Sequence, residues 1–190
     1  MRKILVGVSG ASGTPAARRL MEMLAVVPGI ELDCVVSAGA SETMRHEVGE
    51  DESLFWALAK HAWKPADMTA GPASGSWWEP GSAMVIIPCS MSTLGALAGG
   101  YGDDLLKRAA SAALKERRRL VLVARETPLS RIHLQNMLAL NDAGAVIMPF
   151  SPGFYFRPQT IDELLTHFCW RIMDQLEIEH NGRRWGQGRT

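Results

Sequence analysis

The chain begins with an apolar run followed by a glycine-rich turn, ILVGVSGASGTP at residues 4–15. The run Ile4–Val8 is continuous rather than alternating, which is typical of a strand buried on both faces of a parallel sheet. A helical pattern starts at residue 14, and a helix N-terminus beside glycines favours an anion. We therefore expect a phosphate-cradling loop after this strand. A plain tight turn is the alternative, because the glycines do not have the GxGxxG spacing of a dinucleotide site.

Similar apolar runs recur along the chain, at Leu32–Val36, Met84–Ile87, Leu120–Ala124 and Ala145–Met148. Helical patterns occur between them, at about 14–26, 38–60, 92–117 and 130–142. A last helix is expected at about 161–178, with a Thr160–Glu163 capping box at its start. The alternation of strands and helices predicts an open, doubly wound α/β sheet. We expect a single domain at residues 1–180 and a polar tail at residues 181–190.

The charges of the chain are balanced. Of 190 residues, 20 are Lys or Arg and 20 are Asp or Glu, so the formal net charge is zero. Binding to nucleic acid or to an anionic membrane needs a basic excess, so both are disfavoured, whereas self-assembly is compatible with a neutral surface.

The cysteines form no CxxC pattern and the histidines no HxH or HExxH pattern, so we expect no disulfide framework and no metal site. No apolar stretch has the length of a membrane helix, and a cytoplasmic location is expected.

Hydroxyl-bearing residues follow the second and third apolar runs, where ligands bind in such sheets. Ser37 fits a phosphate contact or, by preference, a helix N-cap. The segment PCSMSTL at residues 88–94 places three hydroxyls at a helix start, which suits the polar edge of a ligand. Cys89 in this segment has no histidine nearby in the sequence. We expect it to be a buried small side chain rather than a nucleophile.

Charged and aromatic residues follow the fourth and fifth runs. Arg125 offers a planar fork of donors to a phosphate or flavin carbonyl, and Glu126 can serve as an acid or base, with a structural ion pair between them as the alternative. Three successive aromatics at Phe154–Phe156 suggest an aromatic-lined pocket or a subunit interface. Arg171 falls on the apolar face of its helix by spacing and therefore requires an anion from a ligand or a neighbouring chain.

Two further features are ambiguous from the residues alone. Arg108 and Lys115 lie seven positions apart on one expected helix, and their spacing favours a solvated basic stripe. Trp77, Trp78 and Trp185 fall in a loop and in the tail, where tryptophans often fill interfaces or pack on planar ligands.

Taken together, these segments resemble the UbiX-type flavin prenyltransferases, a group that includes the B subunits associated with hydroxyarylic-acid decarboxylases. The resemblance spans nearly the whole chain and is carried by GVSGASG at 7–13, SGS at 74–76, PCSMSTL at 88–94, LLKRAASAALKERRRLVLVARETPLSRIHLQNML at 105–138, GAVIMPFSPGFYFRPQT at 144–160 and RRW at 183–185. It implies a three-layer Rossmann-like or flavodoxin-like fold and a homododecamer. It also implies transfer of a dimethylallyl group from dimethylallyl monophosphate to N5 and C6 of reduced FMN, without a metal. The product, prenylated FMN, would pass to a UbiD-type decarboxylase.

The resemblance also implies roles for individual residues. The implied FMN contacts are Gly10, Ala11, Ser12, Ser37, Ser90, Met91, Ser92, Thr93 and Arg125. Contacts to the prenyl phosphate are implied for Tyr155, Arg171, Arg108 and Lys115, which replaces the interpretation of the last two as a solvated stripe. The implied catalytic groups are Glu47, Glu126, Lys115 and Ser12, the last as a proton relay, and Trp185 extends an aromatic wall.

Some positions depart from the family pattern. Ala38 stands where many relatives have Lys, and Ala16-Ala17 where many have Tyr-Gly. The Trp77-Trp78 loop is also longer. The resemblance therefore does not determine the shape of the pocket. Two alternatives remain at this stage. One is an FMN-dependent cysteine decarboxylase, although PASGSW and PCSMST differ from the PASANT-like and PxMN motifs of that class. The other is a non-catalytic flavin-carrier subunit of a decarboxylase.

Overall fold

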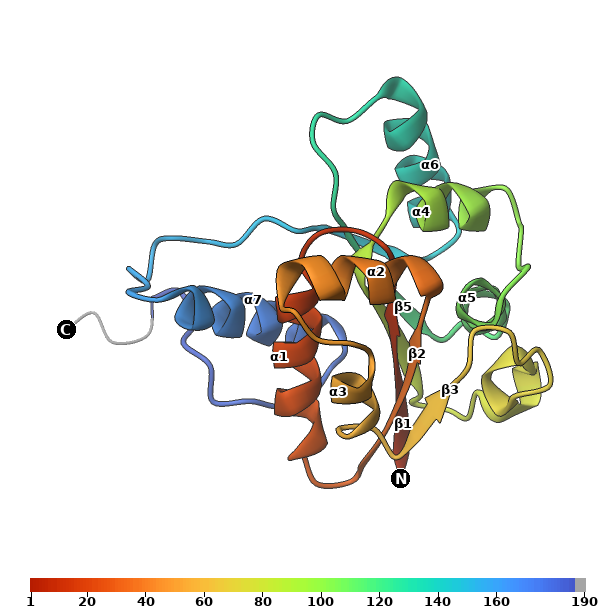
Figure 1. Cartoon of the computed structure of the whole chain (residues 1–190), viewed down its shortest axis with the longest axis horizontal. Coiled ribbons are helices and arrows are strands. Elements are labelled where there is room, and N and C mark those ends of the chain that lie inside the picture. The colour runs from red at the N-terminus through yellow and green to blue at the C-terminus, as the bar shows by residue number, and fades with distance from the viewer. Residues whose placement is uncertain (187–190) are drawn as a thin grey trace.

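A computed structural model describes residues 1–186 of the chain (Figure 1). Its strands are β1 (Arg2–Val8), β2 (Ile30–Val36), β3 (His61–Trp63), β4 (Ala83–Cys89), β5 (Arg119–Ala124) and β6 (Val146–Pro149). Its helices are α1 (Thr14–Ala25), α2 (Ala38–Glu47), α3 (Ser53–Trp56), α4 (Met91–Ala98), α5 (Leu105–Lys115), α6 (Arg131–Asp142) and α7 (Ile161–Gln175), and the short 3-10 turns are η1 (Gly71–Ala73) and η2 (Gly75–Trp77).

The strands form one parallel sheet in the order β3-β2-β1-β4-β5-β6. In β1, Ile4 lies opposite Leu32 of β2 on one side and Ala83 of β4 on the other. The direction of winding reverses between β1 and β4, and ligands of doubly wound sheets bind at the carboxyl ends of the strands at this switch point. The doubly wound α/β architecture predicted from the sequence is confirmed.

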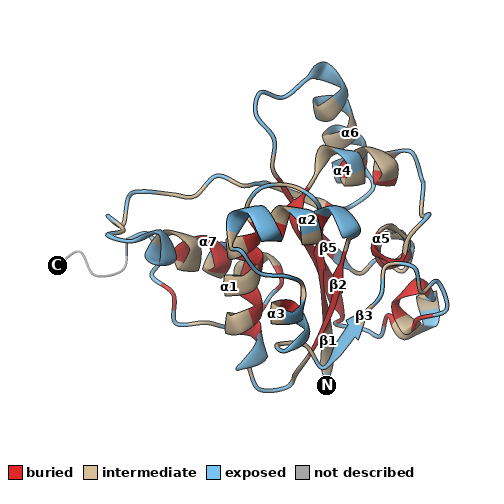
Figure 2. Ribbon diagram, in the orientation of Figure 1, coloured by how far each residue is buried: buried red, intermediate tan, exposed pale blue. Residues whose placement is uncertain are grey.

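Successive side chains of β1 enter different cores, one on each face of the sheet. Ile4 and Val6 pack in a cluster that includes Leu20 of α1 and Ile172 of α7. Leu5 packs in a second cluster, on the other face, which contains residues of α4, α5 and α6. Figure 2 shows the buried residues concentrated in the central strands and on the inner sides of α1 and α5. Both faces are apolar for this reason, and the apolar runs in the sequence are continuous.

Two of the expected helices are each divided into two. The helical pattern at 38–60 forms α2 and α3, and the chain between them passes through Gly49 at a φ of 70°. The pattern at 92–117 forms α4 and α5, separated by a turn with Gly100 at a φ of 76°. A positive φ cannot continue a right-handed helix, and glycine adopts it without steric cost. Apolar residues at helical spacing lie on either side of both breaks, which explains why unbroken helices were predicted from the sequence.

Strand β3 was not predicted, because it is a short edge strand with two exposed residues and no apolar run.

The expected capping box of α7 forms only in part. The Thr160 hydroxyl accepts the Glu163 backbone N–H at 3.1 Å, but the Glu163 carboxylate accepts the N–H of Gln159, at 2.6 Å, instead of that of Thr160. In the expected tail, residues 187–190 lie outside the described residues. None of the helices in the described chain is long and apolar enough to cross a lipid bilayer.

The turn after β1 packs on the first turn of α2 through two glycines, and this contact is testable. A Cβ atom on Gly10 would lie 2.9 Å from the backbone carbonyl carbon of Gly39, whereas a Cβ on Gly39 would lie 3.5 Å from the nearest atom of Gly10. We expect Gly10→Ala to lower the free energy of unfolding by about 1–3 kcal/mol, because backbone atoms must move apart. Gly39→Ala is the matched control and should change it by less than about 0.5 kcal/mol. Urea denaturation measures both, and equal effects would contradict this account of the packing.

Candidate active site at the carboxyl edge of the sheet

The loops that follow β1 and β4 are joined by a buried serine. Ser9 is fully buried, and its hydroxyl donates to the Pro88 carbonyl at 2.9 Å and accepts the Ser90 backbone N–H at 2.8 Å. The Ser37 N–H donates to the Val8 carbonyl at 3.0 Å, which ties the start of α2 to the end of β1. The N-termini of α1, α2 and α4 therefore lie together at the switch point of the sheet.

Glu47, at the end of α2, caps the N-terminus of α1. Its carboxylate accepts the backbone N–H groups of Gly13 and Thr14 at 2.9 Å each, and the Thr14 hydroxyl at 2.7 Å. Burial pulls the pKa of Glu47 upward, but hydrogen bonds from the Ser12 and Thr14 side chains and from the backbone outweigh it, so the pKa lies below its ordinary value. The structure brings Ser12 and Glu47 together, as the resemblance implied. The N–H groups expected to cradle a phosphate here instead bind a carboxylate of the same chain.

The hydroxyl groups expected at a flavin lie at the starts of α2 and α4. Ser37 is the N-cap of α2 and accepts the Ala40 N–H at 3.2 Å, as the preferred interpretation had it. Ser90 is the N-cap of α4, where it accepts the Thr93 N–H at 3.2 Å and donates to the Thr93 hydroxyl at 3.1 Å. Met91 and Ser92 follow in the first turn, and Ser92 is exposed. As N-caps, Ser37 and Ser90 each accept a backbone N–H through the hydroxyl oxygen. A ligand at this edge would therefore meet hydroxyl groups whose orientation is already fixed.

Cys89 is fully buried at the end of β4, and burial raises the pKa of its thiol to about 12. A thiol with so high a pKa is scarcely ionised at neutral pH and is a poor nucleophile. The interpretation of Cys89 as a buried small side chain is therefore supported.

Arg125 and Glu126 follow β5 but do not pair with each other. The Arg125 backbone N–H donates to the Cys89 carbonyl at 3.1 Å, which places the residue beside the start of α4. Glu126 is exposed, and its carboxylate accepts the Thr127 N–H at 2.9 Å. Within residues 1–186, no carboxylate pairs with the half-buried Arg125 guanidinium. The structural ion pair is thus not formed, and the guanidinium can serve a ligand.

A cavity of about 300 Å³ opens beside the end of β6, and it contains two of the four residues expected to contact the prenyl phosphate. Tyr155 and Arg171 both line it, together with Ser151 and His167. The cavity adjoins the turn after β1, because a Cβ on Gly13 would lie 3.0 Å from the Phe150 ring. The expected flavin contacts and two of the expected phosphate contacts, Tyr155 and Arg171, therefore lie at one edge of the sheet.

Arg171 does not lie where its spacing predicted. It is exposed, and its guanidinium pairs with Asp174 in the next turn of α7, so its own helix supplies an anion. The buried face of α7 instead carries His167, which is 2 % exposed. The prediction of an arginine on the apolar face was wrong because helical spacing from Leu164 and Phe168 does not distinguish the centre of a face from its flank, and Leu164 is itself only half-buried.

Asp174 also holds the described part of the tail against α7. It accepts from Arg184 at 2.7 Å and faces the His180 Nε2 at 3.1 Å. Burial opposes the ionised form of Asp174, but hydrogen bonds and charges from Arg184, His180 and Arg171 lower its pKa. The tail then carries Trp185 to the Tyr155 ring, at 5.1 Å between ring centroids in an edge-to-face arrangement. Trp185 thus reaches the edge of the cavity, which fits the aromatic wall implied by the resemblance.

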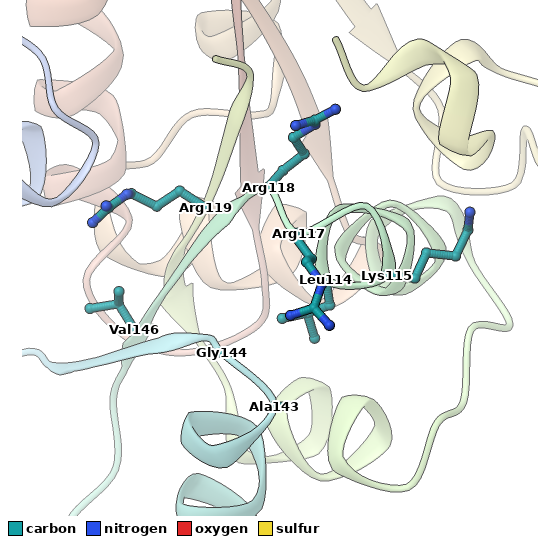
Figure 3. A pocket seen from close by; sticks show the side chains of 8 residues that line it. All are labelled: Leu114, Lys115, Arg117, Arg118, Arg119, Ala143, Gly144 and Val146. Atoms are coloured by element: carbon teal, nitrogen blue, oxygen red, sulfur yellow. The ribbon is translucent and has the colours of Figure 1, made fainter. Parts of the chain in front are cut away.

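Lys115 is not brought to this edge. It ends α5 at the amino edge of the sheet, about one strand length (~20 Å) from the carboxyl edge. There it pairs with Glu116 and lines a separate cavity of about 580 Å³, with Arg117, Arg118 and Arg119 (Figure 3). The cationic side chains in this view point in different directions and do not converge on one ligand position.

Arg108, earlier in α5, donates to the Ala73 carbonyl at 3.0 Å. The Trp77-Trp78 loop also lies at the amino edge, because Trp78 is buried with its carbonyl bonded to Arg118, and Lys3 of β1 lies 5.0 Å from the Trp77 ring. The longer loop therefore does not shape the site of its own chain.

A protein-family model described as Flavoprotein matches residues 1–167. A probable UbiX-like flavin prenyltransferase of Streptomyces sp. (strain D7) is 46% identical, over 96% of this chain and 91% of the relative. The chain belongs to the UbiX-like flavin prenyltransferase family. The resemblance inferred from the sequence is confirmed.

Solved structures of this UbiX-like family superpose closely on the chain. The dodecameric FMN-dependent UbiX-like decarboxylase of Escherichia coli O157:H7 has a TM-score of 0.91 and 43% identity, covering 96% of this chain and 98% of that one. AnUbiX (PadA1), in complex with FMN and dimethylallyl pyrophosphate, has a TM-score of 0.92 and 39% identity, covering 99% of both chains. The FMN-dependent cysteine decarboxylase TvaF has a TM-score of 0.66 and 14% identity, which shows a shared fold and no more.

Two residues of this UbiX-like site were missed by the sequence analysis. His167 was counted only as a histidine outside any ligand pattern, and Asp174 had no assigned role. A signal for each was present, because His167 and Asp174 lie four residues before and three after Arg171 on one helix, within reach of its side chain. Without the fold, nothing distinguished these positions from ordinary helix residues.

The buried His167 predicts a pH dependence of stability. Burial and the nearby Arg171 charge lower the pKa of His167, whereas in the unfolded chain it titrates near its ordinary value of about 6.5. The folded state therefore binds fewer protons, and the free energy of unfolding should fall as the pH drops below about 6.5. We expect His167→Gln to reduce this fall between about pH 7 and pH 5, measured by urea unfolding at each pH. The exposed His46→Gln is the control, and an equal effect of both variants would contradict the assignment.

The role of Asp174 in holding the tail is also testable. Asp174→Asn removes the negative charge shared by Arg171, Arg184 and His180, so we expect residues 180–186 to detach from α7. Hydrogen exchange measured by mass spectrometry should become about tenfold faster in this segment, as expected for the loss of a charged hydrogen bond. Asp162→Asn, on the exposed start of the same helix, is the matched control. Unchanged exchange in the Asp174 variant would refute the role.

Proposed function

We propose that this chain is a flavin prenyltransferase that joins the dimethylallyl group of dimethylallyl monophosphate to N5 and C6 of reduced FMN. The observation that carries the proposal is that the Arg125 and Ser90 region and the cavity lined by Tyr155 and Arg171 are at the same carboxyl edge of the sheet. The structure of AnUbiX (PadA1) in complex with FMN and dimethylallyl pyrophosphate supports the pairing of these two ligand classes.

The residues at this edge fit FMN. We assign its contacts to Gly10, Ala11, Ser12, Ser37, Ser90, Met91, Ser92, Thr93 and Arg125. The Arg125 guanidinium has no carboxylate partner in the described chain. The Ser37 hydroxyl accepts the Ala40 N–H and the Thr93 hydroxyl accepts from Ser90, so each keeps its own proton, and donors for a phosphate and for flavin carbonyls are both present. When bound, reduced FMN supplies the nucleophilic atoms that accept the dimethylallyl group.

Side chains of this protein bind the phosphate and transfer the protons in the proposed reaction. Tyr155 and Arg171 bind the leaving phosphate, and neutralising its charge favours its departure. Glu126, exposed at the end of β5, gives or takes a proton near the reacting atoms. Glu47 remains ionised because its pKa is lowered, and its hydrogen bond with Ser12 orients that hydroxyl as a proton relay. Trp185 and Tyr155 form an aromatic wall that excludes water and stabilises an allylic cation.

Arg108 and Lys115 fit this scheme only through assembly. Both are assigned to the prenyl phosphate, yet Lys115 lies at the opposite edge of its own sheet. We infer that they act in the site of a neighbouring protomer of a homo-oligomer. The dodecameric relative from E. coli O157:H7 supports a dodecamer. We further propose a cytoplasmic enzyme, without a metal, whose product is passed to a UbiD-type decarboxylase.

The decisive experiment is a mass spectrum of the flavin released after anaerobic incubation with reduced FMN and dimethylallyl monophosphate. We expect a flavin heavier by one dimethylallyl unit. Parallel incubations with the diphosphate, and with a peptide ending in cysteine, distinguish donor preference and the cysteine-decarboxylase alternative. Unchanged FMN with unchanged peptide would favour a flavin-carrier subunit and overturn the proposal.

The role of Glu126 predicts a defect in chemistry and not in binding. Glu126→Gln keeps the shape of the side chain but removes its ability to exchange a proton, so we expect prenylation to slow by about 10²–10⁴-fold. The dissociation constant of FMN, measured by flavin fluorescence, should not change. Glu163→Gln, at the start of α7, is the control. Turnover of the Glu126 variant at the wild-type rate would remove this role.

The role of Arg171 predicts a defect in binding of the prenyl substrate and not in chemistry. Arg171→Ala removes a charged partner of the phosphate, so we expect the KM for dimethylallyl monophosphate to rise by about 10–100-fold, with little effect on FMN binding. Arg45→Ala, on the exposed side of α2, removes the same charge elsewhere and should leave the KM unchanged. Steady-state kinetics at saturating FMN separate the two variants, and an unaltered KM in Arg171→Ala would refute the assignment.

A further inference from the structure

His167 is a buried histidine that the scheme above does not use. It is 2 % exposed on the inner face of α7, and its ring stacks on Phe156 at 3.9 Å between centroids. Its Nε2 lies 3.0 Å from the Tyr155 hydroxyl. Its Nδ1 is buried and has no hydrogen-bond partner within residues 1–186. A buried polar atom without a partner is costly and rare in a folded protein.

The unpartnered Nδ1 indicates which ring nitrogen carries the proton. Burial and the charge of Arg171 keep the imidazole neutral by lowering its pKa, so the ring has one N–H group. If that proton were on Nδ1, a buried donor would lack an acceptor. If it is on Nε2, the ring donates to the Tyr155 oxygen and only a lone pair is left unpaired. Buried orphan donors are rarer than under-satisfied acceptors, so the Nε2–H tautomer is favoured.

This tautomer determines what Tyr155 can do. A hydroxyl that donates to a histidine presents only lone pairs to a ligand, and lone pairs repel a phosphate oxygen. A hydroxyl that accepts from a histidine keeps its own proton for another acceptor. Tyr155 and His167 both line the cavity of about 300 Å³ that also contains Arg171, so this proton is available to an anion bound there.

We propose that His167 is a positioning residue that holds the Tyr155 hydroxyl as a hydrogen-bond donor to the phosphate of the allylic substrate. The proposal rests on the function proposed above for the Tyr155–Arg171 cavity. The pair then combines one fixed neutral donor with one cation, a set suited to a phosphate monoester. In this proposal His167 acts through Tyr155 and not directly on the substrate or the flavin.

The direction of the hydrogen bond can be measured without substrate or flavin. The full chain, labelled with nitrogen-15 in its histidines, is studied by NMR, and the His167 ring signals are assigned by their loss in His167→Gln. We expect the Nε2–H tautomer at neutral pH. An Nδ1–H tautomer, or a charged ring, would overturn the inference whether or not the chain is a prenyltransferase.

The action through Tyr155 is tested by a double-mutant cycle on the binding of dimethylallyl monophosphate. His167→Phe keeps an aromatic ring against Phe156 but removes the donor, and Tyr155→Phe removes the hydroxyl. We expect each single variant to weaken binding by about tenfold in calorimetry, and the double variant to bind no more weakly than Tyr155→Phe alone. His167→Gln, whose amide can donate from a similar position, should restore much of the loss seen in His167→Phe.

The outcomes separate positioning from a purely structural role. Independent losses that multiply in the double variant, or no rescue by glutamine relative to phenylalanine, would overturn the inference. FMN binding should be unchanged in all four proteins. Unchanged flavin in the mass spectrum of the wild type would instead refute the proposed function, and the NMR measurement would still decide the direction of the hydrogen bond.

Discussion

The buried hydroxyl of Ser9 joins the two central loops on which the rest of the site depends. It donates to the Pro88 carbonyl and accepts the Ser90 N–H, both across the switch point between β1 and β4. The Pro88 carbonyl also accepts the Ser9 backbone N–H, at 3.2 Å, so a backbone hydrogen bond and the hydroxyl together hold the two loops. Without the hydroxyl, the part-buried Ser90 N–H would lose its partner, at a cost of about 1–3 kcal/mol. The bridge thus contributes both to stability and to the alignment of the expected flavin contacts.

The second constraint is electrostatic. In many doubly wound proteins the first helix N-terminus is where a phosphate binds. Here Glu47 occupies it, and the carboxylate gains several charged hydrogen bonds that lower its pKa. In the proposed function, an anionic ligand at this edge is therefore bound by Arg125 and Arg171 and not by the N-terminus of α1. The fixed carboxylate also accepts a hydrogen bond from Ser12, which orients that hydroxyl.

The sequence predicted the parts of the fold that depend on burial. Runs such as Ile4–Val8 are continuous because both faces of the strand are covered, so the parallel sheet followed from them. The edge strand β3 carries no such signal, since its residues are partly exposed. Helix breaks at Gly49 and Gly100 were missed because apolar spacing continues on either side of each turn.

The candidate site was predictable in its residue types more than in its contacts. The residues after each strand were found because parallel strands end at one edge. Spacing along the sequence could not show which side of each helix faces the core or which helices contact each other. Arg171 was placed on the wrong face, and the capping function of Glu47 depends on two helices that are distant in sequence. A lone histidine such as His167 gains meaning only when the fold shows that it is buried, that one nitrogen has no partner, and that the other meets Tyr155.

The two edges of the sheet carry different residues of the proposed site, and this arrangement gives a physical reason for assembly. The carboxyl edge gathers Arg125, Tyr155 and Arg171, whereas the amino edge holds Lys115 near the Trp77-Trp78 loop. A helix that connects two parallel strands must begin at one edge and end at the other, so the last residue of α5 cannot reach the site of its own chain. A lysine at that position can contribute to phosphate binding only when the amino edge of one protomer meets the carboxyl edge of another. With a net charge of zero, such a chain has little long-range repulsion to oppose that contact.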